Sequence, residues 1–191
     1  MEEIERILHA LVNDKVAPVK EEASIALGRL AARKNFPEFM GVLSSGKPEE
    51  RLRVVYAAEE MGGEEGLKLL MKAVGDAADD VRGAAIRILE NYPRGAVLKA
   101  LVDRLPLEKG YVLGNVISVL GNSGRRELGP VLMNFINHPD TEIQARTIEA
   151  LGRIGSSDAL GEIMSKAESE SPSVRKAVAF ALGAIPLSHG S

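Results

Sequence analysis

The chain has 191 residues, of which 24 are Lys or Arg and 27 are Asp or Glu, so its formal net charge is −3. This near balance lacks the concentrated basic charge that nucleic acids and anionic membrane surfaces attract. The absence of cysteine excludes disulfides, thiolate metal sites and cysteine nucleophiles. No apolar run reaches the roughly 18 residues of a membrane span, and the start MEEIERILHA lacks a basic secretory stretch. We therefore expect a cytoplasmic protein.

One pattern recurs along the chain with a period of 31 residues and no insertion. Equivalent segments begin at Val19, Glu50, Val81, Val112, Ile143 and Val174, which we number as position 0 of each repeat. Position 8 is Leu in all repeats but the second, and position 9 is Gly in four of the six. A second ladder with the same period comprises Phe36, Leu67, Leu98, Gly129 and Leu160. Apolar residues follow it at the i+3 and i+4 spacing of an amphipathic helix.

Each period therefore contains a first and a second helix, separated by Gly-, Pro- and Ser-containing loops. The expected pairs are 2–13 and 16–31, 36–44 and 48–61, 64–75 and 78–91, 94–105 and 109–121, 125–137 and 140–153, and 157–168 and 172–184. One such pair cannot bury its apolar face alone, so neighbouring pairs must stack. The sequence predicts an all-α protein, an α-solenoid or superhelix of six stacked antiparallel helix pairs. We expect one domain with repeats 1–31, 32–62, 63–93, 94–124, 125–155 and 156–186 and a tail, 187–191.

The segments VRKAVAFALGAIP, IQARTIEALGRIG and VRGAAIRILENYP resemble the HEAT-like repeat of the PBS-lyase type. The second helix of that repeat has the pattern V-R-x-x-A-A-x-A-L-G-x-I-G. The resemblance covers essentially the whole chain and implies a superhelix whose concave surface is lined by the second helices. Repeat proteins commonly bind partners on such a surface, although a shared fold does not fix an activity.

Two repeats depart from this pattern. Repeat two has Glu50 and Glu59 where other repeats have Val or Ile and Gly. We expect a solvated helix there, and the alternative is an acidic lip of Glu50, Glu59 and Glu60 for a basic partner. Repeat four has Gly110 at a helix start and Gly114 inside the helix, where glycine costs about 1 kcal/mol relative to alanine. We expect close packing between repeats to explain Gly114, and the alternative is a ligand lying on the helix.

Helical geometry places positions 2, 3, 6 and 10 of the second helices opposite the apolar ladder, so we expect them to be accessible. Aromatic and apolar residues border a floor formed by Gly83, Ala84, Gly114, Asn115 and Ser118. This arrangement suits a partner helix or an extended peptide, and arginines would bind its carboxylates. The expected partner-binding residues are Leu52, Arg53, Tyr56, Arg87, Tyr111, Asn115, Arg146, Arg153 and Phe180. Alternatively, the aromatic residues fill gaps between neighbouring helices.

The segment GNSGRREL provides a candidate anion site formed by Ser123, Arg125 and Arg126. Gly124 precedes an expected helix start, where backbone N–H groups and two guanidinium groups would meet an anion. Against this hypothesis, Gly62, Gly124 and Gly155 share one repeat position, which indicates a structural role for the glycine.

Catalytic and metal-binding motifs do not occur in the sequence. His9, His138 and His189 belong to different repeats, and neither H-x-x-x-H nor G-x-S-x-G is present. We therefore expect no metal, no cofactor and no enzymatic activity.

The sequence thus favours a non-enzymatic scaffold or adaptor that binds a partner helix or peptide on the concave face. The partner would be a protein or peptide, with no nucleic acid and no membrane, and the chain would be a monomer. The alternatives are a subunit or relative of a bilin lyase-type enzyme and, less favoured, a nucleic-acid-binding HEAT-like protein.

Overall fold

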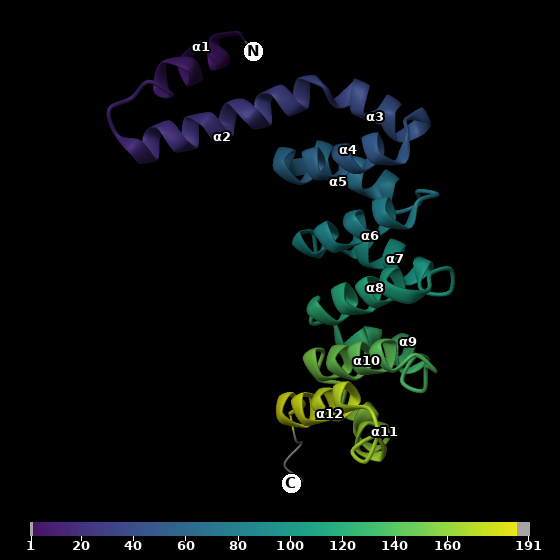
Figure 1. Ribbon diagram of the computed structural model, residues 1–191. Coiled ribbons are helices and arrows are strands. Elements are labelled where there is room, and N and C mark those ends of the chain that lie inside the picture. Colours follow the sequence, from purple (N-terminus) through teal and green to yellow (C-terminus); the bar gives the residue numbers. More distant parts are fainter. Residues whose placement is uncertain (1, 187–191) are drawn as a thin grey trace. The chain divides into compact units, whose positions relative to one another are not determined.

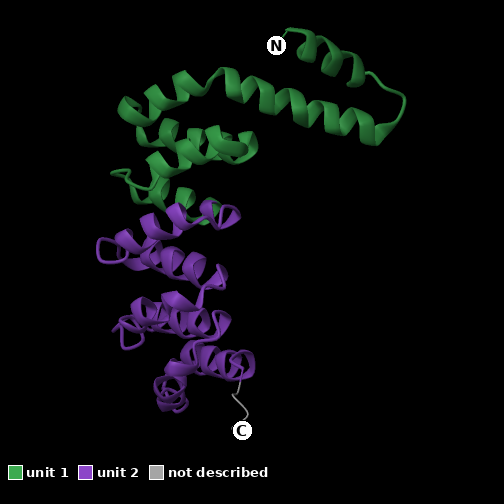
Figure 2. Cartoon of the chain, turned by 180° about the vertical axis from the view of Figure 1, so that it is seen from behind, with its two compact units in different colours: residues 1–88 green, residues 89–191 purple. Residues whose placement is uncertain are grey.

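A computed structural model of the chain describes residues 2–186 (Figure 1). The expected tail 187–191, with His189, lies outside the described residues. The chain divides into two compact units, residues 1–88 and residues 89–191 (Figure 2). The described residues form α-helices and short 3-10 helices, and no strand occurs among them. The all-α fold expected from the 31-residue period is confirmed.

Unit 1 contains three helix pairs in which the second helices are packed in sequence order. Helix α2 contacts α4, and α4 contacts α6. The first helices of the pairs are α1 (Glu2–Leu11), α3 (Phe36–Ser45) and α5 (Gly63–Ala73). The second helices are α2 (Ala17–Lys34), α4 (Pro48–Met61) and α6 (Asp79–Ile88).

Unit 2 repeats this arrangement, and α10 packs against both α8 and α12. Its first helices are α7 (Gly95–Arg104), α9 (Gly129–Met133) and α11 (Leu160–Ser165). Its second helices are α8 (Gly110–Asn122), α10 (Thr141–Arg153) and α12 (Pro172–Ala184). Three 3-10 helices complete the unit, η1 (Leu89–Asn91), η2 (Arg126–Leu128) and η3 (Ser157–Ala159).

The expected helix boundaries are close to those observed except in two first helices. Helices α9 and α11 are much shorter than the predicted 125–137 and 157–168, and a 3-10 helix precedes each. Helix α9 begins with Gly129–Pro130, and neither residue favours the interior of a helix that starts at 125, because glycine has a low helix propensity and proline lacks an N–H. Helix α2 instead extends to Lys34, and Arg33 and Lys34 in its last turn complement the helix dipole.

Glycine at position 9 lets consecutive second helices of unit 2 approach closely. A Cβ on Gly121 would lie 2.5 Å from the Cβ of Ala150, and a Cβ on Gly152 would lie 2.7 Å from the Cα of Ala181. Both alanines occupy position 7 of the following repeat. Because a real Cβ does not approach so closely, any side chain here would push the helices apart.

Arginine at position 1 donates hydrogen bonds to carbonyl groups of the loop between the two helices of a repeat. The Arg51 guanidinium donates to the Gly46 carbonyl at 2.6 Å and to both carboxylate oxygens of Asp76 at 2.7 Å. Arg82 donates to the carbonyl of Asp76 at 2.8 Å, and Arg175 donates to that of Ser169 at 2.6 Å. These bonds satisfy loop carbonyls that helix ends leave without partners.

Asp76 is the acceptor on which Arg51 and Arg82 converge. Burial alone would raise the pKa of this carboxyl, but hydrogen bonds from Arg51 and from the Ala78 N–H, and the charges of Arg51 and Arg82, lower it overall. The same interaction raises the pKa of the Arg51 guanidinium. This structural ion pair was not predicted from the sequence.

Candidate functional site

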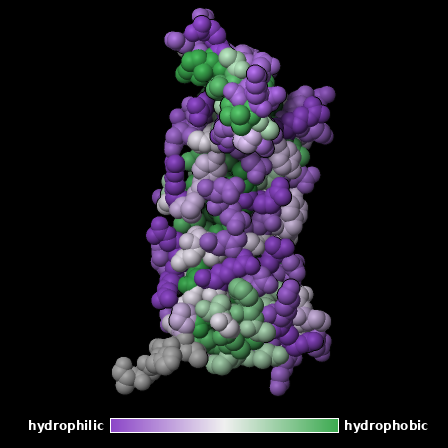
Figure 3. Space-filling model, turned by 90° about the vertical axis from the view of Figure 1, so that its left-hand side faces the viewer, coloured by the Kyte–Doolittle hydropathy of each residue, from purple (hydrophilic) through white to green (hydrophobic). Residues whose placement is uncertain are grey.

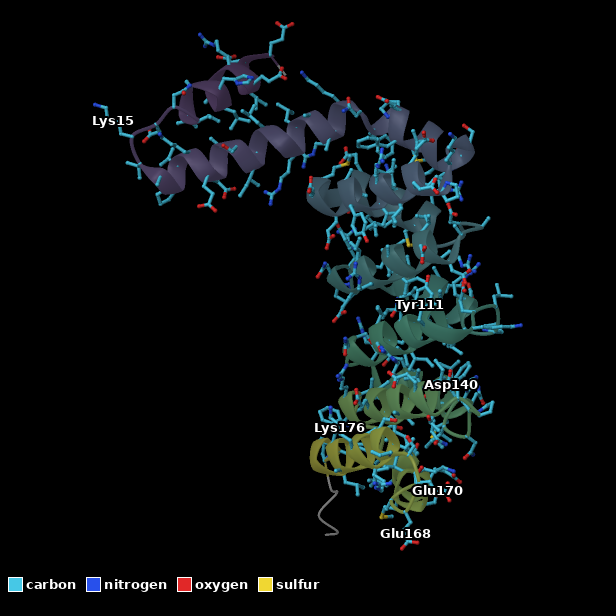
Figure 4. All side chains as sticks on the ribbon, in the orientation of Figure 1. Lys15, Tyr111, Asp140, Glu168, Glu170 and Lys176 are labelled. Carbon is cyan, nitrogen blue, oxygen red and sulfur yellow. The ribbon has the colours of Figure 1, made fainter. Side chains whose placement is uncertain are left out.

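The second helices of unit 2 carry an exposed surface on which aromatic residues flank two arginines. Tyr111, in the first turn of α8, is 53% exposed, and Phe180 on α12 is 43% exposed. Figure 4 labels Tyr111 on α8. Arg146 and Arg153 come from α10, which lies between these two helices. We call the set of Tyr111, Asn115, Arg146, Arg153 and Phe180 the unit 2 B-surface.

Arg146 is held in place by neighbours on two helices. Its Nε donates to Glu142 Oε1 at 2.9 Å, and its Nη1 donates to Ser118 Oγ on α8 at 3.3 Å. Its aliphatic part lies over Gly114, where an added Cβ would be 2.9 Å from the arginine Cδ. The guanidinium is therefore positioned before any partner arrives, which lowers the ordering cost of binding.

Arg153 belongs to a chain of polar contacts that links successive repeats. It donates a hydrogen bond to Asn122 Oδ1 and lies 3.5 Å from Glu149 Oε2. The Asn122 amide in turn donates to Glu90 Oε1 at 2.7 Å. The Arg153 guanidinium carbon also lies 5.6 Å from the centre of the Phe180 ring, within the range of a cation–π interaction. These contacts fix an apolar ring and a cation side by side.

The open floor of small residues expected along the second helices is wrong. Gly83, Ala84 and Gly114 are buried, and Asn115 and Ser118 are half-buried. Positions 2 and 3 are covered because neighbouring second helices pack across them, as Arg146 covers Gly114. The packing explanation of Gly114 is therefore confirmed, whereas the expected accessibility applies mainly to positions 6 and 10.

The aromatic residues of the unit 2 B-surface also contribute to packing between repeats. The Phe180 ring carbon Cδ1 lies 3.5 Å from where a Cβ on Gly152 would be. Phe180 is 43% exposed, so more than half of its surface is covered by neighbouring residues. The two interpretations of the aromatics are thus compatible, since Phe180 packs against the preceding repeat and is still 43% exposed.

In unit 1 the expected residues lie on α4 and α6. Tyr56 is 43% exposed, Arg53 and Arg87 are exposed, and Leu52 is half-buried. The structure adds a cleft of about 540 Å³ between α2 and α4, which the sequence analysis did not identify. Its lining comprises Ser24, Ile25, Gly28, Arg29, Glu59 and Glu60.

This cleft has a recognisable origin in the repeat. Gly28 occupies position 9, but no described atom outside its own local helix lies within 4 Å of where its Cβ would be. At two equivalent glycines of unit 2, Gly121 and Gly152, an alanine of the next repeat occupies this space. Repeat position 9 is Gly28 in the first repeat and Glu59 in the second. This change from glycine to glutamate was the sequence feature that could have indicated the cleft.

The acidic lip proposed for repeat two contains two glutamates rather than three. Glu59 and Glu60 are exposed and line the cleft between α2 and α4. Glu50 instead accepts a hydrogen bond from the Lys47 N–H at 2.8 Å and caps the start of α4. Such a bond satisfies one of the unpaired N–H groups of a helix end.

The prediction that an α-helix begins at Arg125, on which the candidate anion site depended, is wrong. Arg126 begins a three-residue 3-10 helix, and Arg125 precedes it. The Ser123 hydroxyl donates to the Leu120 carbonyl at 2.6 Å and accepts from the Arg125 N–H at 3.3 Å, so both groups already have partners. Gly124 has φ +66°, which agrees with the structural role of this glycine. The helix N-terminus that was expected to bind the anion is therefore absent at this place. An anion site at Ser123, Arg125 and Arg126 stays an untested prediction.

No group of three or more His, Asp or Glu side chains in the described part of the chain is arranged to hold a metal ion. No described helix is long and apolar enough to cross a membrane.

The repeated helix pairs and their Gly-to-Ala contacts define an α-solenoid repeat protein. The family model for HEAT repeats matches residues 4–90, 98–161 and 129–190, so the chain belongs to the HEAT repeat family. The HEAT-like repeat expected from the sequence is thereby confirmed. No curated protein matches the sequence significantly.

Solved structures share this fold at low sequence identity. An engineered protein is 19% identical with a TM-score of 0.55, and the match covers 97% of each chain. The complex of CpcE and CpcF of phycocyanin lyase from Nostoc sp. PCC7120 is 18% identical with a TM-score of 0.55, over 95% of this chain and 76% of that chain. Human deoxyhypusine hydroxylase is 17% identical with a TM-score of 0.47, over 95% and 84%.

Proposed function

We propose that this HEAT repeat protein is a non-enzymatic scaffold or adaptor that binds a partner helix or peptide on its second helices. The observation that carries the proposal is the unit 2 B-surface, where Arg153 is fixed beside the exposed edge of Phe180. A prearranged apolar and cationic pair of this kind suits a hot spot, because little side-chain entropy is lost on binding. The compartment we propose is the cytoplasm.

The charges on this surface favour a partner segment that combines an apolar anchor with a carboxylate. The side chains of Arg146 and Arg153 are 39% and 38% exposed, so a partner can reach both guanidinium groups. Each already pairs with a glutamate on its own helix, at 2.9 Å for Glu142 and 3.5 Å for Glu149. A partner carboxylate would share these donors, and charge-assisted hydrogen bonds would set the direction of the bound segment.

The lyase alternative rests on the fold shared with the CpcE and CpcF complex. At 18% identity this likeness extends to the fold alone, because the same solenoid serves different functions. A lyase-type protein would acquire the visible absorption of a bilin when mixed with it. We expect no such absorption, and we place this alternative behind the scaffold.

The proposal is tested by affinity capture from a lysate with matched variants. Tyr111→Ala/Phe180→Ala removes the two exposed aromatics of the unit 2 B-surface, and Met164→Ala removes an exposed apolar side chain of α11. We expect a protein retained by the unaltered chain and by Met164→Ala to be lost with the double variant. Circular dichroism must first show that all three chains are equally helical.

Retention of the same proteins by all three chains would contradict the proposed surface. A second variant, Leu52→Ala/Tyr56→Ala, tests the residues of unit 1 separately. If only this variant loses the partner, the binding residues lie in unit 1 and the role of the unit 2 B-surface is overturned.

A further inference from the structure

Helix α2 is packed less closely on α4 than the second helices of unit 2 are packed on one another. A Cβ on Gly28 of α2 would have no atom of residues 2–186 outside its own local helix within 4 Å, although the following repeat is part of the chain. Ala57 of α4 is half-buried, whereas its equivalents Ala150 and Ala181 are buried. The cleft of about 540 Å³ lies between these two helices. The contact between the first two repeats is therefore incomplete.

Contacts inside unit 2 define the register in which second helices pack closely. Four pairs of repeat positions meet between one second helix and the next. They are position 9 with 7 (Gly152 and Ala181), 2 with 3 (Gly114 and Arg146), 10 with 10 (Asn122 and Arg153) and 10 with 6 (Arg153 and Phe180).

The first two repeats carry matching residues at all of these positions. Glycine again meets alanine, opposite charges meet at positions 2 and 3 and at position 10, and an arginine meets an aromatic ring. The pairs are Gly28 with Ala57, Glu21 with Arg53, Arg29 with Glu60, and Arg29 with Tyr56. In the structure the four charged residues are exposed and form no ion pair among residues 2–186. The facing residues of α2 and α4 thus suit a close contact that the structure does not contain.

The junction between α2 and α3 explains why the contact is open. Gly62, Gly124 and Gly155 occupy position 12 and have positive φ, which turns the chain from a second helix toward the next first helix. The first repeat has Ala31 at this position, and α2 continues past it, so that only Asn35 separates α2 from α3. The N-terminal part of α2 therefore projects beyond α4 (Figure 1), and hydrophobic side chains lie at the surface of this helix pair, at the top of Figure 3.

We propose that the α1–α2 pair is a movable cap that also closes on α4 in the register of unit 2, with residues 31–35 as the hinge. Closure joins Gly28 to Ala57, pairs Arg29 with Glu60 and removes the cleft. Ala31 disfavours the turn that closure needs, whereas the facing residues favour the contact, and these opposing effects make both arrangements accessible. A partner segment in the cleft would hold the cap open, so closure controls access to it. The motion lies within unit 1 and does not depend on binding at the unit 2 B-surface.

Crosslinking of paired cysteines tests this closure, because the chain has no cysteine of its own. Glu21→Cys/Arg53→Cys brings two thiols together in the closed arrangement. Gly114→Cys/Arg146→Cys is the positive control, at the equivalent positions of packed repeats. Glu21→Cys/Lys68→Cys is the negative control, with its second cysteine at an exposed position of α5. With a short bifunctional maleimide in dilute protein, we expect the first pair to react at least about tenfold faster than the negative control.

Two further substitutions, made in the Glu21→Cys/Arg53→Cys chain, shift the balance in opposite directions. Gly28→Leu fills the space that closure needs and meets nothing within 4 Å among residues 2–186 in the open structure, so it should slow crosslinking at least about tenfold while the chain stays equally helical. Gly41→Leu, at a similarly open glycine of α3, is its matched control and should leave the rate unchanged. Ala31→Gly supplies the missing turn residue and should raise the rate at least about fivefold.

A Glu21→Cys/Arg53→Cys chain that reacts no faster than Glu21→Cys/Lys68→Cys would overturn the proposal. A rate that Gly28→Leu does not lower, or that Ala31→Gly does not raise, would also overturn it.

Discussion

At the scale of single residues, Asp76 accepts hydrogen bonds from two arginines. Asp76 receives both Nε and Nη2 of Arg51 from α4, and its carbonyl accepts from Arg82 of α6. The carboxylate is 5% exposed, so its charge is tolerated only because these donors compensate for lost water. The pair therefore connects two repeats of unit 1 through the loop before α6.

We predict that Asp76→Asn lowers the free energy of unfolding by about 1 to 3 kcal/mol, because the Arg51 guanidinium loses its charged acceptor. The folded-state pKa of Asp76 lies below its ordinary value of 3.8. Its contribution to stability is therefore complete above pH 3.8 and is lost as the pH falls through the lowered pKa. Thermal unfolding of both chains from neutral to acid pH measures this dependence.

Asp79→Asn is the control for this measurement, because Asp79 pairs with Arg82 but its side chain is 65% exposed. It should change stability little, since exposed ion pairs contribute little. A difference between the unaltered protein and Asp76→Asn that persists unchanged at the most acidic pH would contradict the role assigned to the carboxylate.

At the scale of elements, glycine at position 9 controls how closely second helices approach. Gly152→Ala should lower the free energy of unfolding by about 1 to 3 kcal/mol, because its Cβ would lie 2.7 Å from the Cα of Ala181. Gly183→Ala lies at the same repeat position on α12, where its Cβ would have no atom of residues 2–186 outside its own local helix within 4 Å. It should raise stability by up to about 1 kcal/mol, because alanine has a higher helix propensity than glycine. Chemical denaturation of both variants measures the difference. Equal effects would show that helix propensity alone determines the outcome.

The elements themselves could be predicted from the sequence because both ladders keep a 31-residue period. Apolar spacing identified the helices, and the shared glycine position of Gly62, Gly124 and Gly155 identified loops in which all three have positive φ. The shortening of α9 was not predicted, because periodicity alone does not distinguish a tight 3-10 turn from the first turn of an α-helix.

The candidate site was predicted less completely than the fold. Helical geometry correctly placed Tyr56 and Phe180, both at position 6, on an exposed face. It treated each second helix as isolated, so it missed that the next helix covers Gly114. The bond from Arg153 to Asn122 joins residues 31 positions apart and depends on the spacing between helices, which periodicity does not determine.

At the scale of the whole molecule, the chain is a HEAT repeat protein with two compact units built from one kind of helix pair. Each unit presents its own candidate surface, the cleft with Arg29, Glu59 and Glu60 in unit 1 and the arginine-containing B-surface in unit 2. We assign the partner segment that combines an apolar residue with a carboxylate to unit 2, where Arg153 lies beside Phe180 and Arg146 lies on the same helix as Arg153.

Selection of random displayed peptides on the unaltered chain tests this central claim most directly. We predict that enriched peptides combine an aromatic or large apolar residue with Asp or Glu. They should bind the Tyr111→Ala/Arg153→Ala/Phe180→Ala variant at least about tenfold more weakly and bind Met164→Ala as they bind the unaltered chain. Failure to enrich any peptide, or enrichment of peptides that bind the triple variant equally well, would contradict the claim that the second helices of unit 2 form a peptide-binding surface.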